Sequence, residues 1–352
     1  MLFFYNLREF LKVLLLLSLV FSLLLSLYSL VDVLLLYKVS APHIIPKAIL
    51  ITVFSSFYYT APILNCLALM IYMRRVFKKS YDRLSYSFGI SPLRFFMPVL
   101  MASLILSLLQ LALSYSFYPK IFKNAYAIER EFKKGKAKEE LVLNNFWLSL
   151  GEGEKRSYIR IGFANLMDGR VYDVFSVYLQ GNYIYGVLYA KEGLWKDRSL
   201  TLIGAERSYF DSGLKEKKDI TLEFISMDDA RAFGEKLNHL RMDKLISLYS
   251  LAGSLGMNKD VYLAELLLRL VISLSVLALT LPLAYHLLKE RSFLKPSMFF
   301  LLYIALYILS LNLIKITAQE LGRSPLLGAL PFFVLVLLSF RSLYYLGKGF
   351  RV

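Results

Sequence analysis

Long apolar runs and one polar middle segment alternate along the chain. Three runs of membrane length precede the segment from Pro119 to Asp260, and three follow it. About 20 consecutive apolar residues are enough for a helix to cross the hydrocarbon core of a bilayer. The pattern therefore predicts an integral membrane α-helical protein with six transmembrane helices and a domain inserted between the third and the fourth.

The predicted boundaries follow from these runs. Residues 1–118 contain the first three spans, 119–260 the inserted domain and 261–352 the last three spans. The spans are expected at Leu11–Tyr37, Ile49–Met73, Pro92–Phe117, Tyr262–Leu288, Pro296–Thr317 and Leu326–Tyr345. Pro62 lies inside the second span, where a proline removes a backbone hydrogen bond, so we expect a kink there.

Within the inserted domain, apolar and polar residues alternate with the two-residue period of a β-strand. The alternating stretches lie near Phe146–Leu148, Tyr158–Ile161, Val171–Val174, Ile184–Val187, Leu200–Ile203 and Ile220–Phe224. Turn-forming pairs such as Asp168-Gly169 separate them. The flanking stretches Lys120–Glu140 and Asp228–Gly256 have helical character. We therefore expect an extracytoplasmic antiparallel β domain, a sandwich or an open jelly roll, on helical stalks.

A short amphipathic segment, Val76–Phe88, lies between the second and third spans. Its apolar stripe, at spacings of four, three and four, consists of Phe77, Tyr81, Leu84 and Phe88. Largely opposite this stripe lie Lys78, Lys79, Asp82 and Arg83. Gly89 suits the position after a helix end, and Ser91-Pro92 suits the start of the next helix. Such a helix either lies on the lipid headgroups or docks a soluble partner.

Polar residues inside the spans allow two interpretations. In the first span the serines at 18, 22, 26 and 29 share one helical face with Asp32. Small hydroxylated residues favour close helix packing, whereas a face with an ionisable member also suits the wall of a cavity. Glu265 and Arg269 lie four residues apart in the fourth span, a spacing typical of a local ion pair.

The net charge of +16 is concentrated outside the inserted domain. Residues 119–260 hold 23 basic and 20 acidic residues, whereas the rest of the chain holds 19 basic and 6 acidic. On the side of both termini lie 14 of these basic residues, against 3 in the short loops opposite. Basic residues gather in the cytoplasmic loops of membrane proteins. Both termini are therefore predicted to be cytoplasmic, and no nucleic acid is needed to explain the charge.

The chain carries no recognisable catalytic motif. It has one cysteine and three scattered histidines, with no metal-ligand spacing. It also lacks a phosphate-binding loop and a nucleophile elbow. We therefore expect no catalytic residue, metal or cofactor in this chain, and any energy for transport to come from a partner or a gradient.

The order of parts resembles the lipopolysaccharide-export ABC transporter permeases of the LptF/LptG family over nearly the whole chain. The most specific similarities are Ala61-Pro62-Ile63-Leu64, the segment Ser80–Ser91 followed by Leu93-Arg94, and the segment Tyr262–Arg269. In the family, the segment that ends in Phe88-Gly89 is the coupling helix, which seats in a groove of the cytoplasmic ATPase. Relatives usually carry a glutamate eight residues before the glycine. This chain has Tyr81 there, with Asp82 beside it, and one residue turns a helix by about 100°.

The resemblance implies two sets of site residues. The ATPase-coupling set is Phe77, Tyr81, Asp82, Arg83, Leu84, Phe88 and Gly89. The cavity that binds lipid would lie between two permease subunits, beside the first and fifth spans, with Ser22, Ser26, Ser29, Asp32, Lys38, Arg269 and Lys315 as candidate contacts. The basic members fall near the outer leaflet, where lipid phosphates are suitable ligands. For Lys38 and Lys315, simple snorkelling to the interface is the alternative.

The resemblance also implies a function and partners. The chain would be a non-enzymatic permease subunit in the bacterial inner membrane that extracts lipopolysaccharide, or a related glycolipid, and passes it to a periplasmic jelly-roll bridge. Expected partners are an LptB-like ATPase dimer that binds ATP and magnesium, a second LptF/LptG-like subunit, and LptC/LptA-like bridge proteins. The alternatives are a permease for another envelope lipid or lipoprotein, and a non-transporting scaffold for the β domain.

Overall fold

The computed structural model of the chain describes residues 2–37, 45–134, 142–150, 155–181, 183–210 and 213–348. It forms two compact units, one made of residues 1–135 and 264–352 and the other of residues 136–263. Lys38 lies outside the described residues, and Asp32 is described only as part of a helix backbone.

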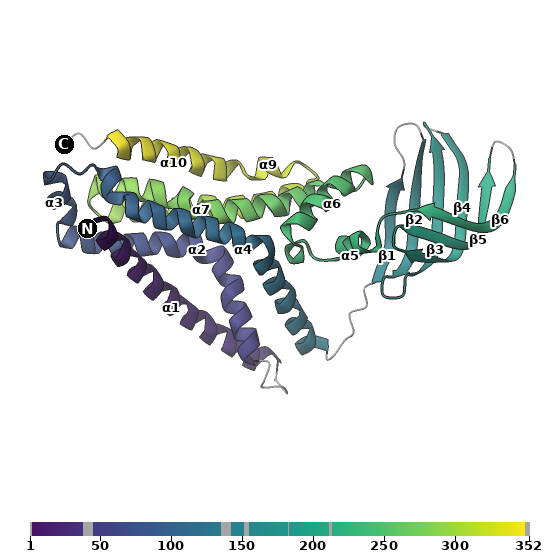
Figure 1. Ribbon diagram of the computed structural model, residues 1–352, viewed down its shortest axis with the longest axis horizontal. Helices are drawn as coiled ribbons and strands as arrows, with labels where there is room; N and C mark the ends of the chain where they lie inside the picture. The colour runs from purple at the N-terminus through teal and green to yellow at the C-terminus, as the bar shows by residue number, and fades with distance from the viewer. Residues whose placement is uncertain are drawn as a thin grey trace. The chain divides into compact units, whose positions relative to one another are not determined.

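Six of the described helices are long and apolar enough to cross a membrane. They are α1 (Leu2–Tyr37), α2 (Ile45–Lys78), α4 (Pro92–Lys134), α7 (Asp260–Glu290), α8 (Leu294–Gln319) and α10 (Leu330–Lys348). Two short helices, α3 (Tyr81–Ser87) and α9 (Pro325–Gly328), connect them. The predicted six-span architecture is thus confirmed (Figure 1).

Helix α7 is the most enclosed of the six. In its most apolar window 67% of the residues are buried, against 28% in α8 and 11% in α1. Serine hydroxyls of neighbouring helices donate hydrogen bonds to backbone carbonyls of α7. Ser107 on α4 donates to the Ser273 carbonyl and Ser339 on α10 donates to the Ala278 carbonyl, both at 2.8 Å. Small residues of this kind let helix backbones approach closely in a membrane. The less enclosed α1 and α8 leave much apolar surface for lipid or another subunit.

The last predicted span is two helices, because the chain breaks at Ala329 between α9 and α10. Gly328 brings α9 against the backbone of α8. A Cβ atom at this position would lie 2.5 Å from the Leu313 carbonyl carbon and from the Ile314 nitrogen. The absence of a side chain therefore permits this contact.

The second unit contains one six-stranded antiparallel sheet. Its strands are β1 (Val142–Leu150), β2 (Lys155–Asn165), β3 (Arg170–Gln180), β4 (Tyr183–Lys196), β5 (Ser199–Tyr209) and β6 (Lys215–Glu223). Each of the six predicted strand stretches overlaps one of them, so the inserted antiparallel β domain is confirmed. The strand order is sequential, an up-and-down meander. This order is simpler than that of a sandwich or jelly roll built on Greek keys, in which the strands are interleaved.

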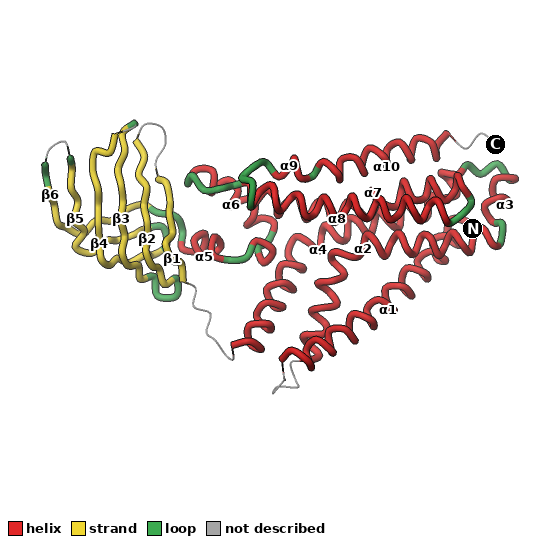
Figure 2. Tube along the Cα trace, turned by 180° about the vertical axis from the view of Figure 1, so that it is seen from behind, coloured by secondary structure: helices red, strands yellow, loops and turns green. Residues whose placement is uncertain are grey.

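A crease crosses every strand pairing of this sheet. Ladder pairs are missing at one level of the sheet, where Asn145, Gly162, Asp173 and Gly204 lie; at this level the register shifts by a residue in the β5–β6 pairing and is unchanged in the others. Three of these residues have positive φ: Asn145 at 50°, Asp173 at 54° and Gly204 at 57°. A residue with positive φ interrupts the extended conformation, so the strand bends there and the side chains beyond it face the opposite side. Figures 1 and 2 show the strands changing direction part-way.

The crease explains how one sheet encloses a core. Buried positions change parity at it, from Ile159 and Ile161 to Ala164 in β2, so the same face of the sheet is buried on both sides. Apolar residues from both halves belong to one cluster around Trp195 and Leu188. The sheet is therefore folded over its own apolar face, which is the feature it shares with a jelly roll.

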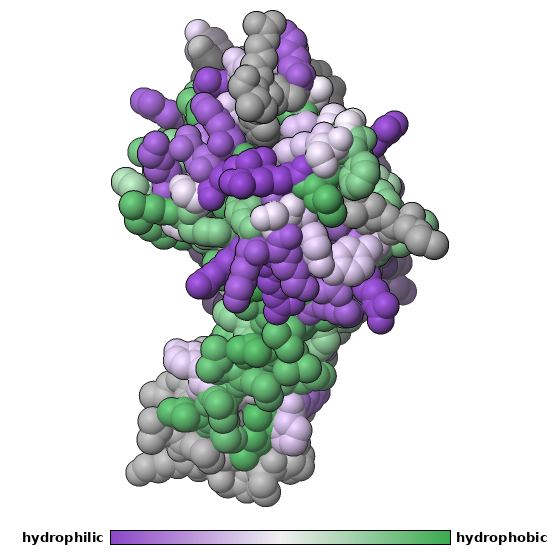
Figure 3. Space-filling view, turned by 90° about the vertical axis from the view of Figure 1, so that its left-hand side faces the viewer, coloured by the Kyte–Doolittle hydropathy of each residue, from purple (hydrophilic) through white to green (hydrophobic). Residues whose placement is uncertain are grey.

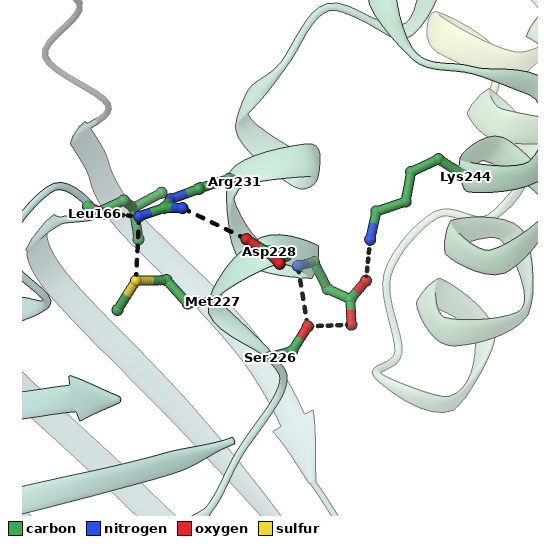
Figure 4. Close-up of polar contacts among 7 residues, drawn as sticks. Leu166, Ser226, Met227, Asp228, Arg231 and Lys244 are labelled. Carbon is green, nitrogen blue, oxygen red and sulfur yellow. Dashed lines mark hydrogen bonds and ion pairs between the residues drawn. The ribbon is translucent and has the colours of Figure 1, made fainter. Parts of the chain in front are cut away.

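Helices α5 (Met227–Gly234) and α6 (Met242–Ser254) follow the sheet, joined by a 3-10 turn at Leu237–His239. Figure 4 shows the polar contacts that hold them. Ser226 caps α5 by accepting from the Asp229 amide at 3.1 Å, and its hydroxyl donates to the Asp229 carboxylate at 2.6 Å. Lys244 on α6 donates to the same carboxylate at 2.5 Å, and Arg231 donates to the Leu166 carbonyl at 2.7 Å. One half-buried carboxylate thus connects the two helices.

The hydrogen bonds to Asp229 also favour the ionised form of its carboxyl group. Burial opposes ionisation of this carboxyl, but the hydrogen bonds from Lys244 and Ser226 together outweigh burial and hold its pKa below the usual value. The charged carboxylate is therefore the form that joins α5 to α6.

Candidate functional site

The predicted amphipathic segment is divided between two helices. Val76, Phe77 and Lys78 end α2, and α3 begins at Tyr81 after Ser80, which has a left-handed φ of 53°. This break changes the helical phase, so the predicted stripe from Phe77 to Phe88 is not continuous. The expectation of one helix over 76–88 is wrong for this reason.

The two faces of α3 differ sharply. Arg83, Leu84, Ser87 and Phe88 are exposed, with 56% of Leu84 and 75% of Phe88 accessible. Asp82 and Ser85 are buried on the opposite face. A seven-residue helix is not stable alone, so contacts of its inner face must hold it. The outer face offers two adjacent apolar side chains beside a cation, which is a suitable surface for docking.

The remaining predicted coupling residues lie against their own chain. Phe77 packs on the Phe293 ring at 5.9 Å and Tyr81 on the Tyr5 ring at 6.1 Å. Asp82 pairs with Arg291 at 3.3 Å. Its carboxylate therefore does not present an acidic contact to a partner.

The end of α3 follows the predicted signals. Gly89 has a φ of +75° and its amide donates to the Tyr86 carbonyl at 2.9 Å. Ser91 then accepts from the Arg94 amide at 3.3 Å, with Pro92 as the first residue of α4. These caps fix where α3 ends and so which of its residues are exposed.

Basic residues gather where α3 and both ends of the described chain lie. Figure 3 faces this end and shows a broad band of hydrophilic side chains across it. The basic residues at or near these helix ends are Arg8, Lys12, Arg74, Arg75, Lys78, Lys79, Arg83, Arg94, Lys289, Arg291, Lys295, Arg341 and Lys348. The docking surface of α3 thus lies within the most basic end of the helical unit.

The serine face of α1 lies against α2. Ser29 is buried and donates to the Thr52 hydroxyl at 3.2 Å, and Ser26 donates to the Ser22 carbonyl of its own helix at 2.8 Å. Ser22 and Ser26 are half-buried. This geometry fits the helix-packing interpretation.

The two described basic candidates for lipid contact differ in environment. Arg269 is buried, and it donates to Glu265 at 3.1 Å and to the Ser114 carbonyl of α4 at 3.2 Å. It therefore joins α7 to α4. Lys315 is exposed on α8, on the same face as Asn312 and Gln319. Lys315 is thus the basic candidate whose side chain can meet a ligand.

Two polar groups that the sequence did not single out lie at the centre of the bundle. The buried amide of Asn65 on α2 donates to the Ser103 hydroxyl of α4 at 2.9 Å and to the Thr280 hydroxyl of α7 at 2.8 Å. Gln110 on α4 donates to the Tyr58 carbonyl at 2.5 Å. An uncharged amide within an apolar run is the signal that marks such residues.

The Gln110 contact compensates for Pro62. Tyr58 precedes Pro62 by four residues, so its carbonyl lacks the usual helical donor. The neighbouring Tyr59 carbonyl accepts from the Tyr307 hydroxyl of α8 at 3.0 Å. Figure 1 shows α2 bending part-way along its length. The bend is therefore held by side chains from two other helices.

Among the residues that the structure describes, no group of three or more histidine, cysteine, aspartate or glutamate side chains has the arrangement of a metal site. The arrangement instead combines a bundle of six helices of membrane length, an inserted folded sheet, and a short helix with exposed apolar side chains at the basic end.

The comparisons with known proteins agree with this arrangement. Residues 4–345 match the family model described as lipopolysaccharide export system permease LptF/LptG. An uncharacterised protein of Aquifex aeolicus (strain VF5) is 32% identical over 353 residues, which cover 99% of each chain. With six apolar helices of membrane length and a family match over nearly its whole length, the chain is a multi-pass membrane protein that belongs to the LptF/LptG family of lipopolysaccharide export permeases.

Proposed function

We propose that this chain is one permease subunit of an ATP-driven exporter that extracts lipopolysaccharide, or a related glycolipid, from the outer leaflet of the inner membrane. The observation that carries the proposal is the outer face of α3, where Leu84 and Phe88 are exposed beside Arg83 at the basic end of the bundle. Two adjacent exposed apolar side chains on a fixed helix fit an apolar groove of a soluble partner. The family match supports a cytoplasmic ABC ATPase as that partner, and ATP and magnesium would bind there.

The orientation follows from the basic end. Basic residues of short loops stay in the cytoplasm, so α3 and both termini would face the ATPase. The folded sheet, inserted between α4 and α7, would then lie in the periplasm. Its edges are β1 and β6, and a sheet edge is where a strand of another β domain adds. A jelly-roll bridge would receive the lipid there.

The lipid itself would move along the outer surface of the bundle beside α1 and α8, where a second permease subunit would complete the cavity. Lys315 is the proposed contact for a lipid phosphate, because its ammonium is exposed on α8. Ser29 and Arg269 would stabilise the walls instead, since both are buried within this chain.

Site-directed crosslinking tests the proposal. Single cysteines at Leu84 and Phe88 should crosslink to a co-purifying nucleotide-binding ATPase in native membranes, because both side chains are exposed on α3. The chain's own Cys66 is buried and gives little background. Cysteines at Leu108 and Leu109, which are exposed on the apolar surface of α4, are the matched controls and should not capture it. Purification in gentle detergent should also recover a phosphorylated glycolipid. Failure of both α3 cysteines to capture an ATPase would favour a non-transporting scaffold.

A further inference from the structure

Arg291 occupies an unusual place for an arginine. It is the first residue after α7, and its φ of 49° lies in the left-handed region, where glycine is the residue of least strain. Its amide donates to the Leu287 carbonyl at 3.0 Å and so closes the helix end. A glycine would make the same turn without strain, so the side chain of Arg291 must contribute something that the turn itself does not need.

That side chain reaches α3. Its guanidinium lies 3.3 Å from the Asp82 carboxylate, whose side chain is 4% exposed, and 5.8 Å from the centre of the Tyr86 ring. A buried carboxylate is costly without a cation beside it. Burial, with a smaller contribution from Asp82, raises the pKa of Tyr86 to about 12, although Arg291 opposes the shift. The inner face of α3 therefore holds a buried carboxylate, and the cation that pairs with it, Arg291, is itself 38% exposed.

A second contact joins the same two segments. Phe293, two residues further along the turn, packs on Phe77 at the end of α2. The residues between α7 and α8 thus contact the α2–α3 region twice, through one ion pair and one aromatic contact. Helix α8 begins directly afterwards at Leu294.

The two helices that flank this turn, α7 and α8, differ in how much of their surface is buried within the chain. Helix α7 is packed on several sides, whereas only 28% of the apolar window of α8 is buried. A displacement of α3 that is carried to the turn is therefore more easily taken up by α8 than by α7. Helix α8 also presents the exposed Lys315.

We propose that Arg291 is a positioning residue that ties α3 to the start of α8, so that movement imposed on the exposed face of α3 is delivered to α8 through the Asp82–Arg291 pair. This inference rests on the proposed function, because it supposes that a partner ATPase acts on α3. Movement of α3 could also reach the membrane through the backbone, along α2 and α4, to which α3 is joined. The proposed transmission is different, because it passes through side chains of two segments that lie about 210 residues apart in sequence.

The test separates docking from coupling. The variants are Arg291→Gly, which removes the tie but suits the left-handed turn, and Arg291→Lys, which keeps the charge. The matched control is Lys295→Gln, which breaks an exposed ion pair to Glu290 beside the same turn. Each is purified with its ATPase and second subunit and reconstituted in proteoliposomes with purified lipopolysaccharide. The measurements are the ratio of ATPase to permease after purification and the lipid released per ATP hydrolysed.

We expect Arg291→Gly to retain the ATPase at the wild-type ratio and to lose about fivefold or more in lipid released per ATP, the lower end of typical coupling between sites. Arg291→Lys should recover most of the loss, Lys295→Gln should behave as wild type, and adding Asp82→Asn to Arg291→Gly should cause no further loss. Wild-type coupling in Arg291→Gly would overturn the inference, and so would loss of the ATPase, which would make Arg291 a folding or docking residue. A wild-type chain that retains no ATPase would overturn the proposed function, and this inference with it.

Discussion

The compensation at Pro62 can be tested as a thermodynamic cycle. Replacing Gln110 by leucine removes the donor to the Tyr58 carbonyl while keeping a side chain of similar size. Replacing Pro62 by alanine instead supplies a backbone amide, so that the Tyr58 carbonyl has a donor within its own helix. If Gln110 acts by compensating for the proline, its loss should be costly only where the proline is present.

The magnitude follows from the environment of the bond. A buried acceptor left without a donor costs about 1–3 kcal/mol. Hydrogen bonds between membrane helices average about 0.6 kcal/mol and reach about 1.7 kcal/mol. Gln110 is buried and its own carbonyl oxygen has no partner among the described residues, which partly offsets the gain. We therefore expect Gln110→Leu to destabilise the wild-type chain by about 1–2 kcal/mol and the Pro62→Ala chain by less than about 0.5 kcal/mol.

The assay is reversible unfolding in mixed micelles, followed as the fraction of denaturing detergent rises, for the wild type, both single variants and the double variant. Asn312→Leu is the matched control, because among the described residues this exposed amide donates to the Ile308 carbonyl of its own helix, at 3.1 Å, and to no other helix. Its effect should be the same with and without Pro62. Equal losses for Gln110→Leu in the two backgrounds would refute the compensation.

Two further predictions concern other parts of the chain. Gly328→Ala should destabilise the helical unit by about 2 kcal/mol or more in the same detergent titration, because the added methyl group would lie 2.5 Å from the α8 backbone. Gly347→Ala is the control and should be nearly neutral, because the nearest atom to its added methyl group lies at 3.9 Å. The lowered pKa of Asp229 contributes stability that is complete above the unfolded value of about 3.9 and is lost as the pH falls through the folded one. Asp229→Asn should therefore make the unfolding of the β domain less dependent on pH below about pH 4. Tryptophan fluorescence measures this unfolding, because both tryptophans, Trp147 and Trp195, lie in that domain. An unchanged dependence on pH in the variant would contradict the prediction.

The spans and strands were predictable because their signals are local. A span needs only a long apolar run, and a strand only a two-residue period, so the six helices and six strands lie near their expected places. The crease in the sheet depends instead on residues such as Asp173 and Gly204 lying at the same level in separate strands. That alignment is a property of the register, which a single sequence does not reveal.

The site was predictable only in part, for the same reason. The caps at Gly89 and Ser91 are local and fall where expected. The partner of Asp82 lies far along the chain, and no local pattern connects it to Arg291. The serine face of α1 likewise has the spacing of a cavity wall and of a packing face, and only the position of Thr52 on α2 distinguishes them.

The position of the acidic residue in α3 decides what its partner must look like. A glutamate at position 81, as the family resemblance would lead one to expect, is replaced by Tyr81, which lies against Tyr5, and the acid one residue later is turned by about 100° into the chain's own interior. The exposed charged side chain of α3 is Arg83, and the apolar side chains exposed with it are Leu84 and, at the helix end, Phe88. A partner groove lined with cations would repel Arg83 and leave two apolar side chains uncovered. Under the proposed function, the ATPase surface that would fit this helix is therefore an apolar groove with a neutral or acidic rim, and the Asp82 carboxylate pairs within this chain.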